Sequence, residues 1–304
     1  MPTDLLLPKN AETYSDKIIE RCEALIESAI WTGLPVQRLH QWLTNFRTGS
    51  EKFLAARMLD SLVYRPLTQT HALITQLVQR SLPDLTRSAA FPRSPIDYWQ
   101  DILSSSSEPG IRIVPVISKG DPPSKSGPVV ARFIQRHLRV NSKWIWWPDD
   151  VRRKLDGKIH TIVFVDDFLG TGYQFLRFFR QEGFGRLDPR VTLVYAPLVA
   201  HERGVLRLRQ SLGRVHLAWV ESLDHTYSLF SPVSDNKLPP DMGAEALRKI
   251  YDQYLKNRQL HVLPKRILGY GQLGLCFSFE HATPNAALPL LWLERSHYIP
   301  LFKR

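Results

Sequence analysis

The segment 161–172 constrains the fold more than any other part of the chain, and it has the sequence TIVFVDDFLGTG. Its first five residues favour strands and show no polar alternation, which is typical of a strand buried on both faces of a parallel sheet. Two carboxylates, Asp166 and Asp167, follow at once, and a short turn rich in Gly and Thr comes next. From Tyr173 onwards, the spacing of the phenylalanines predicts a helix with one apolar side. The segment therefore predicts an α/β fold with a mostly parallel sheet flanked by helices.

This order of elements favours a sugar phosphate as ligand. Backbone N–H groups in the turn and at the helix N-terminus attract an anion such as a phosphate. Gly170 and Gly172 let the backbone approach that phosphate closely, and Thr171 adds a hydroxyl donor. The adjacent carboxylates of Asp166 and Asp167 repel one another unless they face hydroxyl donors or a divalent cation. A ribose diol, with or without Mg²⁺, satisfies them.

The segment resembles the phosphoribosyl-pyrophosphate loop of type I phosphoribosyltransferases, in which an apolar strand precedes two acids, three variable residues and Thr-Gly. The resemblance implies that Asp166 and Asp167 hold the ribose 2′- and 3′-hydroxyls and contribute to binding Mg²⁺. It implies that the 5′-phosphate is wrapped by Phe168, Leu169, Gly170, Thr171 and Gly172. Tyr173 departs from the pattern, because the family usually has a small hydroxyl residue or Gly there. The plain alternative is a strand that ends in Asp-Asp before a turn.

A second polar loop follows the strand expected at 111–117 and leads into a helix expected at 129–138. The same resemblance implies that this loop binds pyrophosphate, because the first sheet strand of the family ends in such a loop. The cations would be Lys119 and Lys125, and Ser126 and Gly127 would offer hydroxyl and N–H donors at the helix start. The segment lacks the second Gly that a nucleoside-triphosphate P-loop needs, so we reject that function.

The formal net charge is +11 and the pI is near 9.7. This balance favours a polyanionic partner, either nucleic acid or a phosphorylated ligand. The plain alternative is a basic, solvated surface without a partner. The excess of Lys and Arg over Asp and Glu is spread over 132–139, 152–158, 177–190 and 203–214. This distribution implies a basic folded surface and not a basic tail.

Composition otherwise indicates an ordinary globular protein, since 43% of the 304 residues are hydrophobic. Cys22 and Cys276 lie far apart among apolar residues, so we expect two buried thiols in a reduced cytosol. The apolar run 5–7 is too short for a signal peptide, and the stretch 286–293 contains Pro289. We therefore expect a cytoplasmic protein with no membrane partner.

Three regions are expected along the chain: an N-terminal helical module at 1–90, a linker at 91–110 and a phosphoribosyltransferase-like domain at 111–304. The module should hold three or four short helices, one of them opened by a capping box at 48–51. A winged-helix-like module and a plain helical cap both fit this pattern. Its aromatic residues Trp42 and Phe46 are expected in the core and not stacked on bases.

The second half of the chain continues the alternation of strands and helices. Strands are expected at 191–199 and 215–220, with a basic helix at 203–212 between them. Ligands bind at the carboxyl ends of such parallel strands, where both polar loops lie. The aromatic cluster 143–147 is expected to cover a helix, with stacking on a base as the alternative.

Two flanking patterns accompany the core motif. The first comprises Trp42, Leu43, Phe46, Glu51 and Lys52, and the second comprises Thr283, Pro284, Asn285, Leu288, Pro289 and Trp292. Together with the core, they resemble the phosphoribosyltransferase-like proteins of bacterial conflict systems, some of which are encoded beside retron reverse transcriptases. The resemblance covers most of the chain. It implies an anti-phage effector or toxin that acts with a reverse transcriptase and its RNA–DNA product.

Two hypotheses of function follow. In the first, the protein binds phosphoribosyl pyrophosphate or a related nucleotide or sugar phosphate with Mg²⁺, and transfers or cleaves at the ribose C1. In the second, it is a catalytically inactive nucleotide-binding or regulatory subunit of a nucleoprotein complex with reverse transcriptase and its RNA/DNA. Tyr173 and the basic charge favour the second. The sequence identifies no general base.

Overall fold

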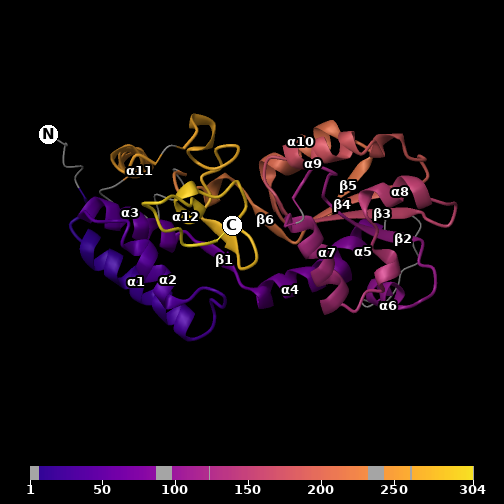
Figure 1. Cartoon of the computed structure of the whole chain (residues 1–304), viewed down its shortest axis with the longest axis horizontal. Coiled ribbons are helices and arrows are strands. Elements are labelled where there is room, and N and C mark those ends of the chain that lie inside the picture. The colour runs from indigo at the N-terminus through magenta and orange to yellow at the C-terminus, as the bar shows by residue number, and fades with distance from the viewer. Residues whose placement is uncertain (1–6, 87–97, 123, 232–242, 261, 304) are drawn as a thin grey trace. The chain divides into compact units, whose positions relative to one another are not determined.

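The computed structural model describes residues 7–86, 98–122, 124–231, 243–260 and 262–303 (Figure 1). The chain divides into two compact units. One comprises Gln69–Leu223, and the other combines the two ends of the chain, Met1–Thr68 and Asp224–Arg304. The predicted fold class is confirmed, because helices at the N-terminus precede a parallel sheet that is flanked by further helices.

The unit Gln69–Leu223 is built on a five-stranded sheet in which the pairings are parallel. Its strands are β2 (Ile111–Pro115), β3 (Thr161–Leu169), β4 (Thr192–His201), β5 (Val215–Leu217) and β6 (Glu221–Leu223). The order is β2-β3-β4-β5, and β6 also pairs with β4. The prediction of one strand at 215–220 was therefore wrong. The edge strand is interrupted, so that β5 pairs with the beginning of β4 and β6 with its end.

Helices cover both faces of this sheet. The helical elements of this part of the chain are α4 (Leu67–Gln76), the π-helical turn Leu77–Ser81, α5 (Leu82–Thr86), α6 (Tyr98–Ser104), α7 (Ser126–His137), α8 (Pro148–Lys154), α9 (Tyr173–Gln181) and α10 (Glu202–Ser211). Figure 1 shows α9 and α10 on one side of the sheet and α7 on the other. The predicted apolar side of α9 is confirmed, because Phe175 packs on Phe164 and stacks on Tyr195 with ring centroids 3.8 Å apart.

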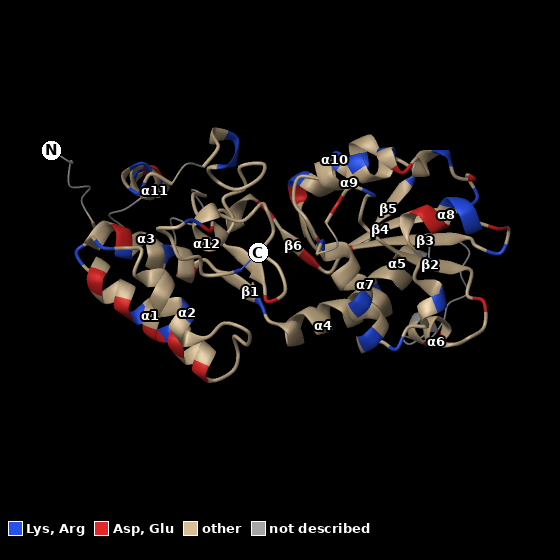
Figure 2. Ribbon diagram, in the orientation of Figure 1, with Lys and Arg blue, Asp and Glu red and all other residues tan. Residues whose placement is uncertain are grey.

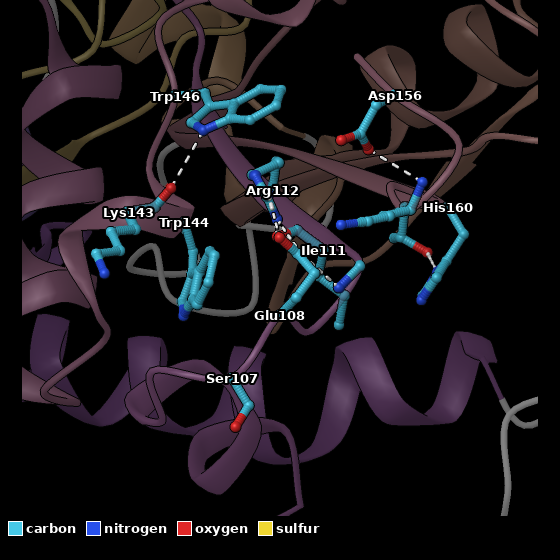
Figure 3. A network of polar contacts seen from close by, with 12 residues as sticks. Ser107, Glu108, Ile111, Arg112, Lys143, Trp144, Trp146, Asp156 and His160 are labelled. Carbon is cyan, nitrogen blue, oxygen red and sulfur yellow. Dashed lines mark hydrogen bonds and ion pairs between the residues drawn. The ribbon is translucent and has the colours of Figure 1, made fainter. Parts of the chain in front are cut away.

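The tryptophan cluster holds an arginine on the first sheet strand (Figure 3). The guanidinium of Arg112 lies 4.9 Å from the ring centroid of Trp144 and 4.4 Å from that of Trp146. Both carboxylate oxygens of Glu108 accept hydrogen bonds from Arg112, each at 2.8 Å. A buried cation needs such compensation. Trp144 and Trp146 thus each place a ring over a charge on β2, a contact that the sequence pattern did not reveal, and the covering of a helix by the cluster stays a prediction.

The other unit joins the N-terminal helices to the C-terminal segment. Its elements are α1 (Ala11–Glu27), α2 (Val36–Leu43), α3 (Gly49–Asp60), β1 (Val63–Arg65), α11 (Ala244–Asn257), β7 (Phe277–Phe279) and α12 (Pro289–Trp292). The predicted capping box is confirmed, since Thr48 accepts from the Glu51 N–H and Glu51 accepts from the Thr48 N–H. The strand β1 pairs in parallel with β7, which differs from the antiparallel hairpin of a winged helix.

Contacts of Trp42 help to explain why the two ends of the chain form one unit. Its side chain is fully buried, and its Nε1–H donates to the Leu290 carbonyl at 2.8 Å and to the Tyr298 hydroxyl at 3.1 Å. Phe46 stacks on Tyr254 with centroids 5.0 Å apart. The prediction of a core role for both aromatics is confirmed. The predicted boundaries placed 224–304 with the sheet, whereas these contacts group that segment with the N-terminal helices.

Three smaller predictions concern the linker, the cysteines and the membrane. Part of the expected linker, 91–97, lies outside the described residues, and α6 occupies part of the remainder. Cys22 and Cys276 are buried free thiols, as predicted. No helix in the described part of the chain is long and apolar enough to cross a membrane.

Candidate functional site

The strand β3 runs past both aspartates, and its neighbour β2 does not. The pairing of β2 with β3 ends at Pro115 opposite Val165, whereas β4 stays paired with β3 as far as Leu169. The expectation of a turn directly after Asp167 was therefore wrong. Asp is rare in strands, but here the pairing with β4 extends the strand. Ligands of α/β proteins bind where neighbouring strands end and their helices leave on opposite faces, and Asp166 lies at such a point.

Asp166 is the centre of a hydrogen-bond network. Its side chain is buried, and Oδ1 accepts from Ser126 Oγ at 2.9 Å and from the backbone N–H of Asp167 at 3.1 Å. Its Oδ2 accepts from Gln174 Nε2 at 3.3 Å, and the Tyr195 hydroxyl is a further partner. The carboxyl group thus joins β3 to β4 and to the first turns of α7 and α9.

Burial makes a negative charge at this position costly. It raises the pKa of Asp166 well above the usual value of 3.8, and the adjacent charge of Asp167 adds to the rise. Hydrogen bonds from Ser126 and from the Asp167 N–H only partly oppose these effects. Burial likewise raises the pKa of Tyr195, with the two aspartates adding to it. A cation or a pair of hydroxyl donors would therefore stabilise the doubly ionised pair.

The turn after β3 is packed tightly on α10. An ideal Cβ placed on Gly204 would lie 2.5 Å from the Gly170 carbonyl oxygen and 2.8 Å from the Leu169 side chain. Arg207 donates a hydrogen bond to the Thr171 carbonyl. The carbonyl groups of Gly170 and Thr171 therefore face α10.

The N–H groups of the same turn point the other way, because a trans peptide directs its N–H opposite to its C=O. Within the described residues, the N–H groups of Thr171 and Gly172 have no hydrogen-bond acceptor in the protein. Gly172 caps α9 with φ 82°, a conformation that favours glycine, and the dipole of the helix favours an anion at this end. The turn consequently offers a cradle for a phosphate group.

Tyr173, which departs from the pattern of type I phosphoribosyltransferases, packs on the α10 side of the turn. Its ring centroid lies 3.9 Å from the guanidinium carbon of Arg207, the residue that also binds the Thr171 carbonyl. The tyrosine side chain is largely exposed. Its contact with Arg207 therefore leaves the N–H side of the turn to a ligand.

The second predicted loop makes its own internal contacts. Lys125 Nζ lies 2.5 Å from Asp121 Oδ2, and Asp121 also accepts from the Ser118 N–H at 2.8 Å. A guanidinium nitrogen of Arg177, on α9, lies 3.9 Å from Asp121 Oδ1. Burial alone would raise the pKa of Asp121, but these donors and charges outweigh it and lower that pKa. Lys125 is thus partly neutralised by the loop itself.

The remaining predicted residues differ in their placement. Ser126 is brought to the aspartate pair by its bond to Asp166. Gly127 serves packing, since a Cβ there would lie 2.7 Å from the backbone N and O of Val116. Lys119 is exposed, and within the described chain it makes no ion pair. Phe168 and Leu169 belong to β3 and not to the turn.

Several residues of the site were not predicted from the sequence. They are Asp121, Gln174, Arg177, Tyr195, Gly204 and Arg207. Gln174 could have been predicted, because it lies in the first turn of α9, the helix that follows the phosphate cradle directly. Asp121 lies within the second predicted loop and Arg177 on the same helix as Gln174. Tyr195, Gly204 and Arg207 approach from β4 and α10, so spacing along the chain does not reveal them.

The chain matches the model of one known protein family. The model of a phosphoribosyltransferase-like family, PRTase-CE, matches residues 39–304. The chain belongs to this family. The match includes both the aspartate pair of β3 and the C-terminal segment of the other unit, so the PRTase-CE pattern extends beyond the parallel sheet. No curated protein matches the chain.

Asp166 and Asp167 are the residues of this PRTase-CE protein that would hold a magnesium ion together with a ligand. No group of three or more His, Cys, Asp and Glu side chains gathers as a metal site in the part of the chain that the structure describes. Mg²⁺ commonly takes one or two carboxylates and completes its shell with water and substrate phosphates. Asp166 and Asp167 therefore suit a magnesium ion that arrives with a phosphorylated ligand.

Proposed function

We propose that this protein binds phosphoribosyl pyrophosphate, or a related nucleotide or sugar phosphate, at the carboxyl end of β3 and reacts at the ribose C1. The observation that carries the proposal is the phosphate cradle, in which the N–H groups of Thr171 and Gly172 open away from α10. This cradle lies directly after a buried carboxyl pair that hydroxyl donors or a cation would stabilise. Membership in a phosphoribosyltransferase-like family supports the same ligand class.

Each part of the site has a role in this proposal. Asp166 and Asp167 would hold the ribose hydroxyls, and Gly170, Thr171 and Gly172 would bind the 5′-phosphate. Lys119, Lys125, Ser126 and Gly127 would bind the pyrophosphate. Departure of pyrophosphate leaves an oxocarbenium-like ribose centre, so the protein needs to stabilise charge and not to supply a covalent nucleophile. Mg²⁺, when bound, would neutralise the pyrophosphate.

We further propose a biological role as an effector or toxin of a bacterial anti-phage system of the retron type, acting in the cytoplasm. The support is the three-part resemblance in sequence, whose flanking motifs include Trp42 and Trp292. The partners in this role would be a reverse transcriptase and its RNA–DNA product.

The second candidate is a binding subunit without catalysis. Two observations favour it. Tyr173 replaces the small residue that follows Thr-Gly in type I phosphoribosyltransferases. In addition, both carboxylate oxygens of Asp166 already accept hydrogen bonds within the protein, so ribose hydroxyls would have to displace Ser126 or Gln174.

Pyrophosphate release from phosphoribosyl pyrophosphate distinguishes the two candidates, with Mg²⁺ present and a bacterial extract as the source of acceptors. The wild type is expected to release pyrophosphate, and Asp166→Asn combined with Asp167→Asn is expected to abolish release while circular dichroism shows a folded protein. Binding without release would select the second candidate. Full activity in the double variant would overturn the roles assigned to the aspartates.

A further inference from the structure

The exposed face of α7 is basic and borders no acidic residue along the chain. The three arginines Arg132, Arg136 and Arg139 are exposed. Arg132 and Arg136 are four residues apart and share one face of α7, and Arg139 follows directly after the C-cap of the helix. Between Asp121 and Asp149, the sequence has no acidic residue. In Figure 2, α7 carries blue segments and no red ones. We call Arg132, Arg136 and Arg139 the α7 basic face.

A second acid-free stretch of the same unit packs beside it. His71 of α4 stacks on His137 of α7 with ring centroids 4.4 Å apart, and it meets Phe133 edge-on at 5.5 Å. Thr75 hydrogen-bonds His137 Nε2 at 3.0 Å. The stretch that contains α4 has no acidic residue between Asp60 and Asp84. The helix α4 therefore adds no carboxylate that would neutralise the arginines.

These arginines differ from the cations of α8 in the same unit. On α8, Arg152 pairs with Asp149 at 3.0 Å, and Arg153 and Lys154 pair with Asp150 at 2.7 and 3.2 Å. By contrast, the structure gives the three arginines of the α7 basic face no ion pair with any residue that it describes. Carboxylates thus compensate the charges of α8, whereas the charges of the α7 basic face remain available to a partner.

The backbone at Arg139 is strained. This residue follows the C-cap of α7 and has φ 55°, in the left-handed region. Gly is the favoured residue at this position, because a side chain there is strained. An arginine thus occupies a position where glycine would suit the fold better.

We propose that the α7 basic face binds the phosphate backbone of a nucleic acid strand. Clustered, unpaired arginines supply sequence-independent affinity for phosphates. An anionic membrane or an acidic protein fits less well, because such contacts use exposed apolar anchors. Among the described residues, the exposed large hydrophobic side chains are Ile30, Trp147, Tyr173, Leu206, Tyr227, Leu263, Tyr270 and Ile299. None of them belongs to α4 or α7.

The α7 basic face would be the binding surface for the proposed RNA–DNA partner, so this proposal rests on the proposed function. Its test is nevertheless separate, because it measures binding of oligonucleotides and needs neither phosphoribosyl pyrophosphate nor catalysis. If phosphoribosyl pyrophosphate did not bind at the aspartate pair, the proposal for the α7 basic face would still stand. If oligonucleotides did not bind at the α7 basic face, the proposal for the aspartate pair would still stand.

Fluorescence anisotropy with labelled single-stranded and duplex oligonucleotides, over a series of salt concentrations, tests this proposal on the full-length protein. The triple variant Arg132→Gln, Arg136→Gln, Arg139→Gly is expected to lose about tenfold or more in affinity. The slope of log K against log salt should fall by roughly 2, because each lost phosphate contact removes about 0.7 to 0.9. The matched control is Arg152→Gln, Arg153→Gln, Lys154→Gln on α8, which removes the same charge and should change affinity by less than about threefold.

Equal losses in the two triple variants would show an effect of net charge alone and would overturn the assignment to α7. Failure of the wild type to bind either oligonucleotide at low salt would also overturn it. Binding to vesicles with phosphatidylserine but not to oligonucleotides would overturn the choice of nucleic acid in favour of a membrane surface.

The single variant Arg139→Gly separates binding from folding. Because glycine relieves the left-handed backbone, the melting temperature should rise or stay unchanged while affinity for the oligonucleotide falls several-fold. Unchanged affinity in a correctly folded variant would exclude Arg139 from the contact.

Discussion

At the scale of single residues, Asp166 combines burial, charge and contacts with three other elements. Ser126 comes from α7, Gln174 from α9 and Tyr195 from β4. A raised pKa is the consequence, since burial and the Asp167 charge both disfavour ionisation. Folding therefore shifts this carboxyl group towards its protonated form.

The first prediction is a pH-dependent difference in stability between the wild type and Asp166→Asn. A carboxyl group whose pKa is raised on folding stabilises the folded state below its ordinary pKa, and this contribution is lost as pH rises through the folded-state value. The wild type should therefore lose stability relative to Asp166→Asn as pH rises from about 4 to about 8. Thermal melts of both proteins across this range measure the difference, and a constant difference would contradict the raised pKa.

The sequence predicted that Asp166 and Ser126 belong to the site, but it did not predict the contacts that surround them. The capping box of Thr48 and Glu51 was predictable, because its partners are three residues apart. Ser126 and Asp166 are 40 residues apart, and their contact arises only when α7 begins beside the end of β2. A pattern along the chain carries no signal for such a contact.

At the scale of elements, the contact between the turn after β3 and the helix α10 shapes the phosphate cradle. The helix can approach because Gly204 has no side chain, and Arg207 then fixes the Thr171 carbonyl. The direction of the free N–H groups depends on this packing.

The second prediction follows from that approach. Helix propensity alone would make Gly204→Ala stabilising by up to about 1 kcal/mol. Instead, the new Cβ would meet the Gly170 carbonyl oxygen at 2.5 Å, so we expect destabilisation by about 1–3 kcal/mol and weaker phosphate binding. Denaturant unfolding and titration with ribose 5-phosphate measure both effects. The control is Gly213→Ala, whose Cβ would have no neighbour within 4 Å; equal behaviour of the two variants would refute the packing argument.

Strand positions were predicted better than strand ends. The β2, β3 and β4 strands were expected from their apolar runs, and all three are present. The extension of β3 to Leu169 was not, because Asp166 and Asp167 belong to a residue type that disfavours strands. Pairing with the long strand β4 overrides that local preference.

At the scale of the whole molecule, the two ends of the chain fold together. The C-terminal segment forms one unit with the N-terminal helices, through the β1–β7 pair and through Trp42. The sequence suggested that Trp42 is a core residue, but it did not reveal the partner Leu290. Such a long-range contact depends on the complete fold of the unit.

The third prediction concerns this association of the two ends. Trp42→Phe keeps an aromatic ring but removes the Nε1–H that donates to Leu290 and Tyr298. The Leu290 carbonyl keeps its hydrogen bond from the Tyr298 hydroxyl, but the buried donor that serves both groups is lost, so unfolding should become easier by about 1 kcal/mol. Trp147→Phe is the control, because Trp147 is 56% exposed. Chemical denaturation followed by circular dichroism compares the variants; similar midpoints for both would argue against a structural role for the Trp42 hydrogen bonds.

In the proposed function, the aspartate pair and the phosphate cradle form one site for a phosphorylated ribose. Isothermal titration of the protein with phosphoribosyl pyrophosphate, with and without Mg²⁺, measures binding at this site. We predict binding that strengthens with Mg²⁺ and disappears when Asp166 and Asp167 are both replaced by Asn. No binding in the presence of Mg²⁺, or equal binding by the folded double variant, would contradict the claim.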